Sequence, residues 1–184
     1  MSDRRSALRR LLADHVPADE LEEGYRGRIS ELLDTPGDPF SRGHFDPGHI
    51  TASAFVLSPD GEDLLLILHG KLGLWLQPGG HVDPTDPDVL AAARREVAEE
   101  VGLGDEDVEF GGLLDLDVHP IPPNPKKGEP AHEHFDVRIL LTSRTRSFRV
   151  GSDAKDARWV PLSDVQDAGT DDSVRRAVRK LLRR

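Results

Sequence analysis

Three glutamates on one predicted helix constrain this chain more than any other feature. Residues 87–101 have the composition of a helix, with several alanines inside. Glu96, Glu99 and Glu100 are three and four residues apart, so a helix places them on one face, where like charges repel. A hard divalent cation such as Mg²⁺ or Mn²⁺ would relieve the repulsion, because it prefers oxygen ligands. The alternative is a solvated acidic surface, which such a cluster usually forms.

The residues around the glutamates favour the metal-site interpretation. Residues 80–103 resemble the Nudix box, G-x(5)-E-x(7)-R-E-U-x-E-E-x-G-U, in which U is a bulky aliphatic residue. The matching positions are Gly80, Arg95, Glu96, Val97, Glu99, Glu100, Gly102 and Leu103. The loop after Gly80 is one residue longer than the pattern, and the first glutamate of the box is absent. Asp86 or Asp88 is its nearest substitute, and Asp86 is also expected to cap the helix.

The resemblance implies a fold and an activity. The fold is of the α/β class, a Nudix-like α/β/α sandwich around a mixed β-sheet. The activity is metal-dependent hydrolysis of a diphosphate linkage, in a nucleoside diphosphate derivative or a related small molecule, by in-line attack of water. Glu96, Glu99 and Glu100 would hold Mg²⁺ or Mn²⁺, with Glu99 and Glu100 central to catalysis. Gly80 would let the backbone approach the metal, and Arg95 would orient a glutamate through a bidentate ion pair.

Two other functions of the same fold are weighed against hydrolysis. A non-catalytic Nudix-like sensor would bind a nucleotide and regulate another process, but such domains usually lose the glutamates that this chain keeps. The second function is isomerisation of a prenyl diphosphate. Proteins of the same fold that carry it out use an active-site cysteine. This chain contains no cysteine, so that activity is set aside.

The pattern of the whole chain indicates one α/β domain with an N-terminal extension. Strands are expected at 49–58, 63–69, 108–119, 132–142 and 157–160, with a Gly-rich loop at 70–80 and a basic helix at 171–183. Two helices are expected within residues 2–34. We therefore expect an N-terminal helical extension at 1–44 and a Nudix-like domain at 45–184.

Two of the expected strands alternate so that polar side chains share one face. These residues are Asp115, Asp117 and His119 in the first strand, and His132, His134, Asp136 and Arg138 in the second. If the strands pair, the two polar stripes form one surface. In one interpretation this surface is a cleft in which His119, His134, Asp136 and Arg138 bind substrate. In the other it is an exposed sheet face whose histidines make ordinary hydrogen bonds.

Other candidates lie in loops. Glu133, at the exit of the Pro-rich loop 120–130, is a candidate general base. Lys127, beside Lys126 in that loop, is a candidate ligand for substrate phosphates, although loop lysines are more often simply solvated. Trp75 is a candidate stacking partner for a base and equally suits the core.

Charge and composition limit the partners of the chain. It has 24 Lys and Arg residues and 34 Asp and Glu residues, which gives a net charge of −10. This charge argues against electrostatic binding to the backbone of a nucleic acid and favours a small phosphorylated substrate. No apolar run reaches the roughly 20 residues that span a membrane, and the N-terminus lacks the features of a secretory signal. We expect a cytoplasmic protein without membrane contact, and the resemblance allows a homodimer. The basic C-terminal helix is expected to pack on the acidic body, and His44 and His49 to serve in the core or as caps.

Overall fold

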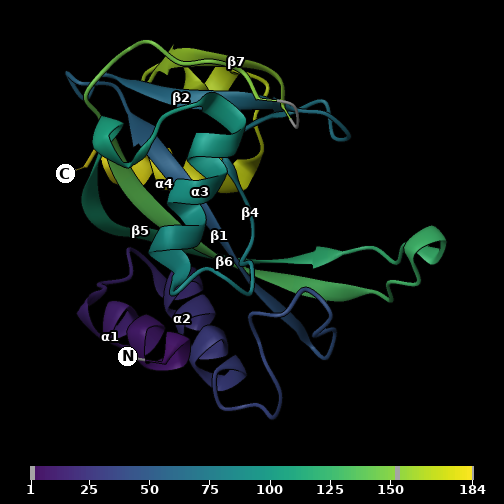
Figure 1. Cartoon of the computed structure of the whole chain (residues 1–184). Helices are drawn as coiled ribbons and strands as arrows, with labels where there is room; N and C mark the ends of the chain where they lie inside the picture. The colour runs from purple at the N-terminus through teal and green to yellow at the C-terminus, as the bar shows by residue number, and fades with distance from the viewer. Residues whose placement is uncertain (1–2, 152–153, 184) are drawn as a thin grey trace.

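A curled, mixed β-sheet forms the centre of the structure, a computed structural model that describes residues 3–151 and 154–183 (Figure 1). Its helices are α1 (Arg4–Asp14), α2 (Glu20–Leu32), α3 (Val89–Val101) and α4 (Asp172–Leu181), with short 3₁₀ helices at Asp105–Asp107, Pro125–Lys127 and Val165–Asp167. Its strands are β1 (Gly48–Leu57), β2 (Asp63–His69), β3 (Trp75–Leu76), β4 (Gly79–His81), β5 (Val108–Ile121), β6 (His132–Ser143) and β7 (Ala154–Pro161).

The strand order explains why the sheet is mixed. The central path is β3-β2-β1-β6-β5, with β4 paired to β1 and β7 paired to β2. Strands β1 and β6 run parallel, with His49 opposite His134, and the other pairs are antiparallel. Strands β3 and β4 lie in the segment for which the sequence predicts a loop. Gly79 allows β4 to pair there, because a Cβ on it would lie 2.4 Å from the Cβ of Ser53.

Helices cover both faces of the sheet, which confirms the predicted sandwich. Alternate residues of β1 face opposite ways, as a strand requires. On one face α3 packs against Ile50, Ala52, Ala54 and Val56. On the other face α4 buries Val174, Ala177 and Val178 against Phe55, Leu64 and Leu66. Among the described helices, none combines the length and apolar character that a bilayer-spanning segment requires.

The N-terminal helices share the core of the sheet. Leu8 and Leu12 of α1 and Ile29 and Leu32 of α2 are buried in the same apolar cluster as α3. A boundary near residue 44 remains a prediction.

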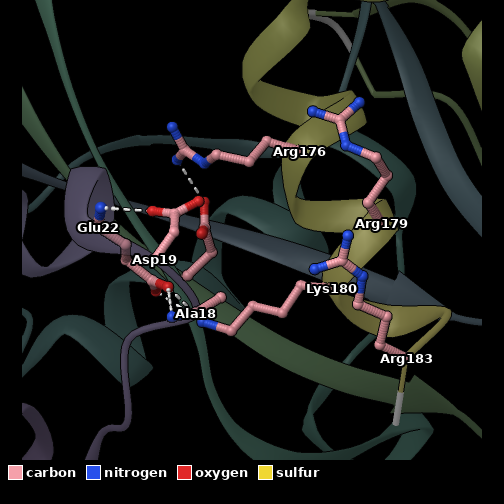
Figure 2. A pocket seen from close by; sticks show the side chains of 8 residues that line it. Ala18, Asp19, Glu22, Arg176, Arg179, Lys180 and Arg183 are labelled. Carbon is pink, nitrogen blue, oxygen red and sulfur yellow. Dashed lines mark hydrogen bonds and ion pairs between the residues drawn. The ribbon is translucent and has the colours of Figure 1, made fainter.

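An ionic contact joins α2 to the basic C-terminal helix (Figure 2). The Nζ atom of Lys180 donates to both carboxylate oxygens of Glu22 at 2.6 and 2.7 Å, and His15 Nε2 lies 2.6 Å from Glu22 Oε1. Close by, Arg176 of α4 donates to Asp115 of β5 at 2.7 Å. The packing of the basic helix on acidic groups of the body is thereby confirmed.

Strands β5 and β6 form a long hairpin that extends from the body and carries the Pro-rich loop at its tip (Figure 1). Their register places His119 opposite His134, Asp117 opposite Asp136, and Asp115 opposite Arg138. The two polar stripes therefore lie side by side, as their alternation predicts.

Candidate active site

Helix α3 presents the glutamates because its first turn is fixed by Asp88. The side chain of Asp88 accepts a hydrogen bond from the Ala91 amide at 2.9 Å, and Gly102 ends the helix with φ at +67°. The prediction that Asp86 caps this helix is wrong. Asp86 instead turns toward Arg95, whose Nη2 lies 3.1 Å from Asp86 Oδ2. Asp86 thus supplies a carboxylate in the loop where the motif has its first glutamate.

Arg95 connects the acidic groups of this region. Its Nη1 atom donates to Glu96 Oε1 and to Glu99 Oε2, both at 3.0 Å, and its Nη2 donates to the carbonyl of His81 at 2.8 Å. The bidentate ion pair that was predicted for a glutamate is made with Asp86 instead, through Nε and Nη2 of Arg95. Glu96 and Glu99 each accept a single hydrogen bond from Arg95. The guanidinium therefore fixes two glutamates at once and ties α3 to β4.

The two glycines of β4 let the sheet approach the helix. A Cβ on Gly80 would lie 2.5 Å from Glu96 Oε1, closer than any real contact. The Gly79 amide donates to Glu100 Oε2 at 3.0 Å. Glycine is therefore required at position 80 if the carboxylate of Glu96 is to keep its place.

The three glutamates lie at different depths in one cleft of about 580 Å³. Glu100 is buried, the side chain of Glu96 is 14% exposed and that of Glu99 is 55% exposed. Burial raises the pKa of Glu96, although the charge of Arg95 opposes this shift. A bound cation would offset the same burial cost. These three carboxylates offer only oxygen ligands, they differ in exposure, and the glycine backbone of β4 lies beside them. This arrangement fits a hard divalent ion that keeps some water ligands.

Strands β1, β5 and β6 form the floor beside the glutamates. Asp136 accepts hydrogen bonds from Ser53 Oγ at 2.8 Å and Thr51 Oγ1 at 3.1 Å. His119 Nδ1 lies 2.9 Å from Asp117 Oδ2, and this contact raises the pKa of His119 in spite of its burial. Because His119, His134 and Asp136 all line the cleft, three of the predicted substrate-binding residues lie beside the glutamates.

Arg138 lies behind this floor. It is fully buried and contacts Asp115, Asp117 and Asp136 at 3.1 to 3.4 Å, and its Nη2 donates to Ser173 of α4. Its positive charge is paired with these buried aspartates, so Arg138 holds Asp136 in position and does not contact a substrate in the cleft.

Two other predicted residues also lie outside the cleft lining. Glu133 forms an ion pair with Arg28 of α2, and it is not among the residues that line the cleft with the glutamates of α3. The ring of Trp75 is covered by the guanidinium of Arg158, whose Cζ lies 4.0 Å from the ring centre. The side chain also packs against the apolar cluster that includes residues of α4. The roles of Glu133 as general base and of Trp75 as base-stacking partner stay predictions.

The cleft continues toward the hairpin into a space of about 570 Å³ that the sequence does not reveal. Lys127 lines this outer part, as does Ile121 of β5. His49, expected in a core or capping role, lines it as well, together with His132. Residues far apart in sequence meet here only because β1 and β6 pair in parallel, a pairing that local patterns do not show.

Comparisons with known proteins agree with this geometry. The model of the NUDIX domain family matches residues 47–181. The chain is 37% identical over 115 residues to a probable DHNTP pyrophosphohydrolase of Lactococcus lactis subsp. cremoris, covering 62% of this chain and 66% of that protein. It is 32% identical over 97 residues to the m7GpppN-mRNA hydrolase NUDT17 of Bos taurus, covering 50% of this chain and 32% of that protein. The alignments thus span less than two thirds of either relative.

A solved structure supports the fold. The dihydroneopterin triphosphate pyrophosphohydrolase of E. coli superposes with a TM-score of 0.58 at 15% identity, covering 73% of this chain and 96% of that one.

Proposed function

This chain belongs to the Nudix family, and from that premise we propose that it hydrolyses a phosphoanhydride linkage in a small phosphorylated substrate. The observation that carries the proposal is the convergence of Glu96, Glu99 and Glu100 with the backbone of β4 at one cleft. These glutamates would hold Mg²⁺ or Mn²⁺. When bound, such an ion supplies charge for the phosphate oxygens and lowers the pKa of water.

The residues of the chain itself set the geometry for that reaction. Arg95 holds Glu96 and Glu99 in fixed orientations, and Asp86 holds Arg95. Gly80 gives the carboxylate of Glu96 the room it needs. Preorganisation of this kind reduces the cost of placing a phosphate and a water in line.

The remainder of the cleft would bind the rest of the substrate. His119, whose pKa is raised, can carry a positive charge toward phosphate oxygens. Lys71 lines both parts of the cleft and Lys127 lines the outer part, so both add positive charge along the same path. The net charge of −10 favours a small ligand over a long nucleic acid, which needs a broad basic surface.

A screen for phosphate release tests the proposal. The full chain is assayed with Mg²⁺ and with Mn²⁺ on two groups of compounds. Nucleoside triphosphates and a pterin triphosphate are assayed with pyrophosphatase, which converts released pyrophosphate to phosphate. Nucleotide sugars and dinucleoside polyphosphates are assayed with alkaline phosphatase, which releases phosphate from the phosphomonoester ends that hydrolysis creates. We expect metal-dependent turnover of at least one compound. Glu100→Gln should abolish most of it, and Glu106→Gln, at an exposed position beyond the helix, should not.

Two results would contradict the proposal. Turnover that survives in Glu100→Gln would place the chemistry elsewhere. No turnover on any compound, while some of them raise the melting temperature, would favour the alternative of a non-catalytic sensor.

A further inference from the structure

Histidines from three strands meet in the outer part of the cleft, and two of them, His81 and His134, also line the part that holds the glutamates. They are His49 of β1, His81 of β4, and His132 and His134 of β6. The ring centre of His49 lies 4.8 Å from that of His134 and 5.1 Å from those of His132 and His81. The rings of His132 and His134 lie 5.4 Å apart.

Backbone carbonyls fix the proton positions of two of these rings. His49 Nδ1 lies 3.1 Å from the carbonyl of His44, and His132 Nδ1 lies 2.8 Å from the carbonyl of Pro130. A carbonyl can only accept, so each Nδ1 is the donor. In the neutral ring Nε2 then carries the lone pair. Metal-bound histidines typically have this arrangement, with one nitrogen on a carbonyl and the other on the ion.

The Nε2 atom of His49 has no partner of its own. His49 is 1% exposed, and within residues 3–151 and 154–183 its Nε2 is buried without a hydrogen bond. Leaving a buried polar atom unsatisfied costs about 1–3 kcal/mol. A ligand that accepts this lone pair would remove the cost.

We propose that His49, His132 and His134 form a binding site for a borderline-soft divalent cation of the Zn²⁺ class, separate from the carboxylate site. Each residue offers one ring nitrogen, and the three atoms lie within 4.8 Å of one another. A tetrahedral zinc ion with nitrogen ligands at about 2.05 Å keeps them roughly 3.3 Å apart. Small rotations about the side-chain torsions close that difference.

The ionisation of His49 and His134 agrees with this geometry. Burial lowers the pKa of His49 and lowers that of His134 to about 2, and the neighbouring rings add to both shifts. The charge of Arg42, which lines the cleft, acts in the same direction on His49. These shifts favour the neutral rings of His49 and His134, the form that binds a metal.

The two sites would select different ions. Imidazole nitrogens suit Zn²⁺ and related transition metals, whereas the carboxylates of α3 suit Mg²⁺ or Mn²⁺. All three histidines line the cleft, so the remaining position of the ion faces the space where a substrate would lie.

Cobalt absorption tests the site without any assay of turnover. The full chain, without an affinity tag and freed of metal by a chelator, is titrated with Co²⁺. We expect a visible absorption band much stronger than that of octahedral aqueous Co²⁺, saturating at one equivalent and abolished by Zn²⁺. The variants His132→Ala and His134→Ala should each weaken Co²⁺ binding at least tenfold.

Two variants serve as matched controls. His119→Gln changes a histidine whose ring lies 5.6 Å from that of His134 and which hydrogen-bonds to Asp117. Glu99→Gln removes a carboxylate of the other site. Both should keep the band. The proposal is overturned if the wild type gives only the weak octahedral spectrum, or if the band is unchanged in both alanine variants.

A measurement on the wild type covers the case in which the alanine variants do not fold. Zn²⁺ added to the ¹⁵N-labelled protein should shift the Nε2 resonances of His49 and His132 and leave that of His119 in place. Unmoved resonances for His49 and His132 would overturn the site. Because neither readout involves hydrolysis, the site can fail while the proposed function holds, and the reverse.

Discussion

Replacing Glu22 by glutamine would remove the negative charge that joins the N-terminal helices to α4. Burial alone would raise the pKa of this carboxyl. Hydrogen bonds from His15, Lys180 and the Ala18 amide outweigh burial and lower the pKa from 4.5 to about 2. The difference corresponds to about 3 kcal/mol in favour of the folded state when Glu22 is ionised. Glutamine keeps the size of the side chain and removes this contribution.

The sign of the pH dependence follows from the lowered pKa of Glu22. The stabilisation is fully present above the unfolded pKa of 4.5 and is lost as the pH falls through about 2. In urea unfolding we expect Glu22→Gln to reduce the free energy of unfolding by about 3 kcal/mol at pH 7 and by about 2 kcal/mol at pH 3.5. Glu31→Gln, at an exposed position of the same helix, should change it by less than about 0.5 kcal/mol. A loss below about 1 kcal/mol at pH 7, or an equal loss at both pH values, would refute the reasoning.

Two further substitutions test the cleft and its support. Gly80→Ala should reduce turnover at least tenfold with little change in melting temperature, because the added Cβ would displace the carboxylate of Glu96. Gly24→Ala, on an open helix surface, is the control. Full activity of Gly80→Ala would contradict the role of the glycine. Arg138→Met should lower the free energy of unfolding by about 3–5 kcal/mol, because it removes the cation of buried Asp136 and leaves Asp115 and Asp117 with Arg176 as the remaining arginine. A melting temperature equal to that of the wild type would show that these aspartates are compensated in another way.

Local patterns were sufficient for most of the elements. The alternation of β5 and β6 predicts the polar stripe of each strand, because side-chain direction in a strand has a strict period of two. The structure adds the pairing of the two strands, which the sequence alone leaves as a condition. The end of α3 follows from Gly102. The predicted start of α3 was wrong because both Asp86 and Asp88 could cap the helix. Asp86 contacts Arg95, so Asp88 is the residue that caps it. That contact crosses from a loop to a helix and leaves no local signal.

The candidate site was predictable only where its residues are close in sequence. Glu96, Glu99 and Glu100 share one helix turn, so their spacing is informative. The histidine group depends on the parallel pairing of β1 with β6, which joins segments more than 80 residues apart. The ion pair of Glu133 with Arg28 of α2 was not predictable for the same reason.

Parallel measurement of Mn²⁺ binding and turnover tests the central claim, that the carboxylates of α3 hold the ion that the reaction needs. Electron paramagnetic resonance reports free Mn²⁺ in the wild type, in Glu99→Gln and in Glu106→Gln. Glu99 is half exposed, so its replacement should leave the fold intact. We predict that Glu99→Gln weakens Mn²⁺ binding at least tenfold and lowers turnover by roughly 100-fold or more, with Glu106→Gln unchanged. Turnover and Mn²⁺ binding that both persist in Glu99→Gln would contradict the claim.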